Sequence, residues 1–151
     1  DLLGRKVFGT GGKSVQMMAA RIKDSIDKFG ALPEVAPFAA ELGKRVEQWG
    51  KLTLELGGAA MKNHEEVGAA AADYLAVAGY VCLGWCWLVS AGVSAKKLAA
   101  GDAEADFYKA KLVTAKFYFD RILPRIDAHA AAARAGAAGL MDLPAEHFAF
   151  A

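Results

Sequence analysis

The sequence predicts an all-α fold: an antiparallel, up-and-down four-helix bundle with a kinked last helix and a short C-terminal tail. Apolar residues make up 55% of the 151 residues, with much alanine and few β-branched side chains, a composition that favours helices over strands. Apolar side chains recur at steps of three and four in several segments, and no long segment alternates as a strand does. The connections between these segments are short, which is typical of antiparallel neighbours in a bundle.

The chain is expected to divide into a lead-in segment at 1–12 and a bundle domain at 13–151. Residues 1–12 are rich in glycine and show no clear period, so they resemble the end of a connection more than the start of a domain. The first residue is Asp1, so we expect either a processed start or a piece of a longer protein. A first helix is predicted from about Lys13 to a stop at Gly30. Its inward stripe is Val15, Met18, Ile22, Ile26 and Phe29.

A second helix is expected to begin at Pro33 or Pro37, because the first turn of a helix tolerates a missing N–H. Gly57 and Gly58 are predicted to end or kink it. Its apolar stripe is Val35, Phe38, Leu42, Val46, Trp49 and Leu56.

The third helix, around 68–95, is the most apolar part of the chain and has Asp73 as its only charged residue. Apolar side chains on nearly every face predict a central helix that its neighbours cover well. The stretch 74–95 is uncharged and, at about 1.5 Å per residue, long enough to cross a bilayer. Its many Gly, Ala, Ser and Cys residues favour a buried helix over a membrane span.

The fourth helix is predicted to begin at Asp102, with Glu104 and Asp106 favouring the positive end of the helix dipole. Pro124 should kink it, since proline removes a backbone donor. Its predicted inward face is Phe107, Leu112, Ala115, Phe119, Ile122 and Ile126, and the alanine-rich stretch 128–135 continues it. A short tail follows from Gly136, with one more helical turn after Leu143 and Pro144.

No residue is assigned a catalytic, cofactor-binding or metal-binding role. Cys82 and Cys86 share a helical face, but two thiols without a nearby histidine do not complete a zinc site, and we expect two small buried side chains. No histidine has a glutamate three residues before it, so the spacing of a di-iron bundle is missing.

The remaining polar candidates are expected to be structural. His64, Glu65 and Glu66 are predicted to form a solvated first turn, and His129 to be partly exposed. The segment 9–14 has some likeness to a phosphate-binding loop but lacks its first glycine and a preceding strand. With 18 Lys and Arg against 17 Asp and Glu, no nucleic-acid partner is expected. The aromatic residues within 107–119 are expected to pack in the core and to dock partly onto another domain or subunit.

Several stretches, in this order, resemble the C-terminal extension of the acyl-CoA dehydrogenase family. Residues 1–6 (Asp-Leu-Leu-Gly-Arg-Lys) are similar to the segment that follows the catalytic helices in the subclass of enzymes like 3-methylmercaptopropionyl-CoA dehydrogenase. The stretches 107–118, 123–125 and 139–144, with the apolar helix at 79–91, are similar to the rest of that extension. The resemblance covers nearly the whole chain.

The resemblance implies a non-catalytic domain of an enzyme that oxidises the Cα–Cβ bond of an acyl-CoA thioester. In the family a glutamate removes the α-proton and FAD accepts the β-hydride, and both sites lie upstream of Asp1, so no such residue is assigned here. The implied partners are the missing catalytic core and further subunits of a homo-oligomer, with acyl-CoA as the parent's substrate and no membrane. Cytoplasmic localisation is expected. The alternatives are a free-standing helical interaction module and, less favoured, a membrane-anchored bundle.

Overall fold

The computed structural model describes residues 1–148, which form helices joined by turns and contain no strand. The all-α prediction is confirmed. The last three residues of the predicted bundle domain, 149–151, lie outside the described part. The α-helices are α1 (Lys13–Phe29), α2 (Ala36–Ala60), α3 (Glu65–Ala99), α4 (Ala105–Phe117), α5 (Ile126–Ala133) and α6 (Ala138–Met141). The π- and 3₁₀-segments are η1 (Leu2–Val7), η2 (Phe8–Thr10), η3 (Tyr118–Ile122), η4 (Leu123–Arg125) and η5 (Ala145–Phe148).

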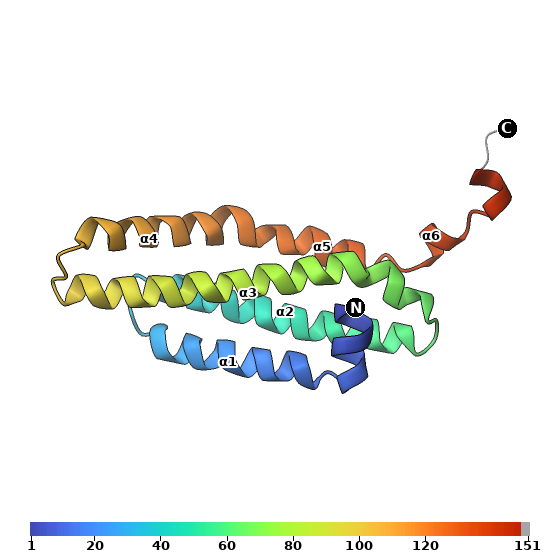
Figure 1. Ribbon diagram of the computed structural model, residues 1–151, viewed down its shortest axis with the longest axis horizontal. Coiled ribbons are helices and arrows are strands. Elements are labelled where there is room, and N and C mark those ends of the chain that lie inside the picture. The colour runs from blue at the N-terminus through green and yellow to red at the C-terminus, as the bar shows by residue number, and fades with distance from the viewer. Residues whose placement is uncertain (149–151) are drawn as a thin grey trace.

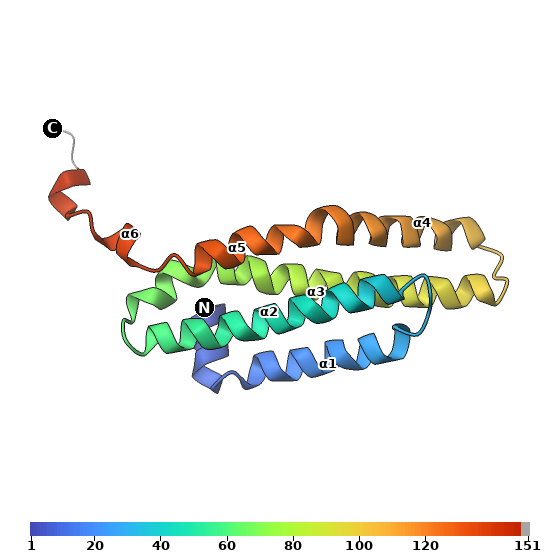
Figure 2. The same ribbon diagram turned by 180° about the vertical axis from the view of Figure 1, so that it is seen from behind.

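The long helices lie side by side along the long axis of the molecule, and the chain reverses direction at each short connection between them (Figures 1 and 2). The longest is α3, with 35 residues. In Figure 1, α4 and α5 lie above α3, α1 lies below it and α2 lies behind it. Helix α3 packs against all of these neighbours, which makes it the centre of the fold.

The core surrounds α3 because its small residues let large side chains approach from three sides. Val77 and Leu88 of α3 are fully buried. Gly84 has no side chain, and an added Cβ atom would lie 3.1 Å from Leu42 of α2, with Tyr118 and Leu123 close by. The size of this residue therefore sets the distance at which α2 and the last helical segments pack on α3.

The N-terminal segment is more ordered than the sequence indicated. Residues 2–10 form η1 and η2, and the Leu3 and Val7 side chains are buried in the core. The sequence shows no apolar periodicity there that predicted a helix. The turn at Gly11 and Gly12 has positive φ angles, which only glycine adopts easily, and α1 then begins at Lys13 as predicted. The predicted inward stripe of α1 is buried or half-buried.

The sequence predicted that Gly57 and Gly58 end or kink the second helix, and the structure does not end the helix there. Pro37 lies in its first turn, as expected, but Gly57 and Gly58 lie inside α2, which continues to Ala60. The Phe8 ring would contact a Cβ atom on Gly57 at 3.5 Å, so the N-terminal segment packs against α2 at this glycine. Intrinsic helix propensity is a weak determinant that such packing overrides.

The kink at Pro124 is confirmed. Here α4 gives way to the π-segment η3 and the 3₁₀-segment η4 before α5 resumes, as expected where proline cannot donate a backbone hydrogen bond. Two other predictions for this helix are wrong. Asp102 accepts a hydrogen bond from the Glu104 N–H in a turn, and α4 begins only at Ala105. Phe107 is 54% exposed instead of inward-facing, because α4 packs on α3 along one side only.

A polar cluster joins α2 to α5, and we expect the stability of the domain to fall at acidic pH because of it. Arg45 donates to Asp127 at 2.6 Å, and Gln48 donates to the same carboxylate oxygen at 2.8 Å. Partial burial acts to raise the pKa of Asp127, but the hydrogen bonds from Gln48 and Arg45 outweigh it and lower the pKa. Because the pKa of Asp127 is lower in the folded than in the unfolded protein, its carboxylate stabilises the fold at any pH above its pKa in the unfolded chain. This stability is lost as the pH falls through the lower pKa of the folded protein.

We therefore expect Asp127→Asn to reduce stability at neutral pH and to flatten the loss of stability below about pH 4. Urea unfolding of both proteins across pH 3 to 7 measures this. Because Asp127 is largely exposed, the effect should be small, and Asp142→Asn, at an exposed carboxylate outside the cluster, is the control. Parallel pH profiles for wild type and Asp127→Asn would contradict the prediction.

Candidate functional site

No α-helix in residues 1–148 lies in front of α3 in the view of Figure 1, and the short segment η1 packs beside this helix near Leu75. Leu75, Leu83, Cys86 and Val93 share one side of α3 by their helical spacing. Leu75, Leu83 and Val93 are 58%, 53% and 45% exposed, and Cys86 is exposed as well. We call these four residues and the surface between them the open face of α3. The prediction that this helix is well covered is wrong here, because periodicity reveals which residues share a face and not how many neighbours a helix has.

The open face carries no charge along most of its length. Between Asp73 and Lys96 the helix has no charged residue, and Asp73 itself is hydrogen-bonded to α5. An uncharged helix surface of this length on a domain with charged side chains elsewhere marks an interaction site. The open face is therefore the main candidate for a contact with another protein surface.

A groove of about 330 Å³ extends the open face toward α1 and the N-terminal segment. Leu75 and Gly79 of α3 line one side, and Met18 of α1 lines the other. Because Gly79 has open space where a side chain would lie, the groove floor comes close to the α3 backbone. The groove gives the open face a concave part that a protruding apolar side chain can enter.

Length and composition alone would allow α3 to cross a membrane, but 39% of its apolar stretch is buried inside the protein. The helices around it carry exposed charges, among them Lys23, Lys44 and Lys109. Placing these charges in hydrocarbon is costly, so the arrangement favours a helix covered by protein on three sides and apolar on one.

The two cysteines lie at the open face and differ in exposure. Cys82 is half-buried, whereas Cys86 is exposed, so the expectation of two buried thiols is wrong for Cys86. Burial raises the pKa of the Cys82 thiol, and the neighbouring Cys86 raises it further. A thiol with a raised pKa is a poor nucleophile and a poor metal ligand at neutral pH. Within residues 1–148 no group of three or more His, Cys, Asp and Glu residues could hold a metal ion.

The structure brings together one pair that sequence spacing could not reveal. His129 of α5 lies 2.8 Å from Asp73 of α3, measured from Nδ1 to Oδ1, and its ring is tilted against Tyr80. The two residues are 56 positions apart, and no local motif marks the pair. The pair therefore joins α5 to α3.

The other polar candidates have structural roles. His64 and Glu65 lie at the start of α3 and are exposed, and the Asn63 side chain accepts a hydrogen bond from the Glu65 N–H in the turn before the helix. In the segment similar to a phosphate loop, the hydroxyls of Thr10 and Ser14 both donate to the carbonyl of Lys6. These hydroxyls therefore close the turn before α1 and do not point to a ligand.

The aromatic cluster is divided between the core and the surface. Tyr118 and Phe119 are buried: the Tyr118 hydroxyl donates to the Tyr80 carbonyl at 2.8 Å, and Phe119 stacks on Phe38. Phe107 and Phe117 are 54% and 57% exposed on α4. The exposed members give α4 an apolar outer surface in addition to the open face of α3.

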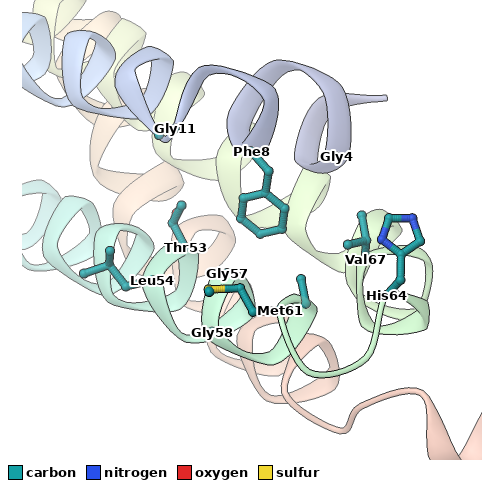
Figure 3. Close-up of a pocket in the computed structure, with 12 residues that line it drawn as sticks. Gly4, Phe8, Gly11, Thr53, Leu54, Gly57, Gly58, Met61, His64 and Val67 are labelled. Atoms are coloured by element: carbon teal, nitrogen blue, oxygen red, sulfur yellow. The ribbon is translucent and has the colours of Figure 1, made fainter.

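A second groove, of about 550 Å³, lies at the end of the molecule where α2 ends and α3 begins. Figure 3 shows the Phe8 ring reaching from the N-terminal segment toward α2, with Leu54 on α2, Met61 just after the end of α2 and Val67 on α3 around it. We call this the α2 groove. It is lined mostly by apolar and glycine residues: Gly4, Phe8, Gly11, Gly12, Thr53, Leu54, Gly57, Gly58, Ala60, Met61, His64 and Val67.

The helical fold of residues 1–148 agrees with comparison to known families. The family described as Acetyl-CoA dehydrogenase C-terminal like matches residues 15–144. The chain belongs to this family. No curated protein matches the chain. The match extends from α1 to the C-terminal tail and supports an acyl-CoA dehydrogenase C-terminal domain without a catalytic role.

The described part of this C-terminal domain does not fit FAD. A dinucleotide needs hydrogen-bond donors or cations at its diphosphate, usually at a glycine-rich turn before a helix. The glycine-rich turn at 9–14 has its hydroxyls occupied internally, and the grooves of about 330 Å³ and 550 Å³ described above are predominantly apolar. No step of a flavin reaction is therefore assigned to the C-terminal domain.

Proposed function

We propose that this chain is the non-catalytic C-terminal domain of a flavin-dependent acyl-CoA dehydrogenase and that its open face packs against the catalytic core. The family match supports the assignment to a dehydrogenase C-terminal domain. The open face supports the docking role, because Leu75, Leu83 and Val93 lie exposed on an uncharged side of the central helix. Burying such a surface against a partner is favourable in proportion to the apolar area removed from water.

The scaffold for this role is an antiparallel four-helix bundle in which three neighbours hold α3 and leave its fourth side free. A packed core holds α3 in place, since Val77 and Leu88 are fully buried on the sides opposite the open face. A rigid surface loses little conformational entropy on binding, which favours a stable domain contact.

The wider proposal follows from the resemblance of residues 1–6, 107–118 and 139–144 to enzymes like 3-methylmercaptopropionyl-CoA dehydrogenase. In this proposal the parent protein is a cytoplasmic homo-oligomer that oxidises an acyl-CoA with FAD, and residues upstream of Asp1 bind the flavin and supply the catalytic glutamate. In this proposal the C-terminal domain packs beside the dehydrogenase core, supports the oligomer or borders the entrance of the acyl-binding site.

The test compares two exposed apolar residues on different sides of the domain. Leu83 lies on the open face and Met17 on the outer side of α1, and both are more than half exposed, so lysine at either position should leave the fold intact. Binding of the purified domain to the dehydrogenase core, produced without its C-terminal domain, is measured by titration calorimetry, together with flavin retention and turnover of the core. Leu83→Lys should weaken binding at least tenfold, whereas Met17→Lys should not change it.

Equal binding of both variants would overturn the docking role of the open face. A wild-type domain that does not bind the core and changes neither flavin retention nor turnover would favour a free-standing interaction module. Sedimentation of the wild-type domain with lipid vesicles, lost in Leu83→Lys, would assign the open face to a membrane instead. Circular dichroism of each variant verifies that the fold is retained.

A further inference from the structure

The C-terminal tail, residues 138–148, carries apolar side chains that are largely exposed, although Leu140 and Met141 border a hollow at the start of α3. Every residue of this tail is exposed, and Leu140, Leu143 and Phe148 are 65%, 49% and 64% exposed. Figures 1 and 2 show α6 and η5 leading away from the body of the molecule beyond α5. An exposed segment with this many large apolar side chains is unfavourable in water and favours a partner.

The α2 groove offers a complementary site. Met61 and Leu54 at its rim are 90% and 78% exposed, and the Phe8 ring lies between the N-terminal segment and α2. Gly58 brings the α2 backbone to the groove surface and has no atom within 4 Å of an added Cβ atom, so an incoming side chain can lie close to the helix there. Its volume of about 550 Å³ is in the range of pre-formed binding sites.

The two features lie near the same end of the molecule but on different sides of it. In both views the tail leaves α5 on the side away from the N-terminal segment that forms one wall of the groove. The tail therefore points away from the groove of its own chain. A second copy of the chain has the same tail and the same α2 groove. In a symmetric dimer each tail can therefore dock in the groove of the other copy, which makes the same contact twice.

We propose that two copies of this domain associate by exchanging their C-terminal tails, the apolar side chains of 138–148 of one copy docking in the α2 groove of the other. The pairing is reciprocal: each copy gives one tail and receives one. The exchanged tail uses surfaces other than the open face of α3. Self-association of the isolated domain and docking to a catalytic core are thus independent of each other.

The test uses two variants that each remove one half of the pairing. In the first, residues 138–151 are deleted after the buried Ala137, which leaves the groove intact. In the second, Gly58→Trp fills the groove, and no atom lies within 4 Å of an added Cβ atom there, so the helix can accept the side chain. Gly50→Trp, at another open position on α2 outside the groove, is the matched control. Mass is measured by sedimentation velocity over a hundredfold range of concentration.

Wild type and Gly50→Trp should form dimers, and each of the two variants alone should dissociate at least tenfold more readily. An equimolar mixture of the two variants should form a one-to-one heterodimer, because one intact groove and one intact tail remain. A wild type that stays monomeric throughout would overturn the proposal, as would a tail deletion that dimerises as well as wild type. A mixture that forms no heterodimer would also overturn the proposal. This is the result expected if each groove holds the tail of its own chain.

Discussion

Gly92→Ala should lower the free energy of unfolding by about 1–3 kcal/mol, although alanine is the better helix former. Gly92 lies in the middle of α3, where the Phe29 ring at the end of α1 packs directly on its backbone. A Cβ atom at this position would overlap three atoms of that ring. Phe29 is 4% exposed and is flanked by Lys28 and Lys96, so the ring has little freedom to move away.

The same substitution elsewhere in α3 should have the opposite sign. Gly79 also lies inside the helix, but no atom lies within 4 Å of an added Cβ atom. Gly79→Ala should therefore stabilise the domain by about 0.5–1 kcal/mol through backbone entropy alone. Urea denaturation of both variants measures the difference. If both alanines stabilise the domain, the close packing of Phe29 on α3 is contradicted.

Leu88→Ala should destabilise the domain by about 2–5 kcal/mol. Leu88 is fully buried in the core around α3, and truncation removes buried methyl groups and leaves a cavity that close-packed neighbours fill only in part. For a chain of this size each kcal/mol shifts the melting temperature by about 2–4 °C, so the loss is easily seen by thermal unfolding.

Leu83→Ala is the control for this prediction on the same helix. Leu83 is 53% exposed on the open face, so its truncation should change the stability of the isolated domain by no more than about 0.5 kcal/mol. A large loss at Leu83 would mean that a partner covers the open face in solution even without the core. Equal losses at both positions would contradict the burial pattern of α3.

Local sequence signals predicted much of the fold. The start of α1 at Lys13, Pro37 in the first turn of α2 and the irregular helix around Pro124 were all correct. Each depends on a property of the chain within one or two turns: the period of apolar residues, or the missing N–H of proline. The wrong predictions, such as an inward-facing Phe107 or a buried Cys86, concern places where burial depends on whether a distant segment packs on the helix.

The candidate site was largely beyond the reach of the sequence. The apolar pattern from Leu75 to Val93 predicted a central helix, but the segments that pack on α3 leave one of its sides open. The same limit applies to the contact of Asp73 with His129, which no spacing rule connects. The α2 groove combines residues from the N-terminal segment and two helices, so it exists only after these elements have packed.

The sequence by itself determined that this protein is helical, where most of its helices begin and kink, and, through its resemblance to a family that the comparison confirms, that it is an acyl-CoA dehydrogenase C-terminal domain. Those properties depend on residues that are close together along the chain, or on the order of short motifs along the sequence. Only the tertiary structure decided which apolar side chains are buried and which remain available for contacts. Exposure depends on how many neighbours a helix acquires, and this number is fixed by packing between segments that are distant in sequence.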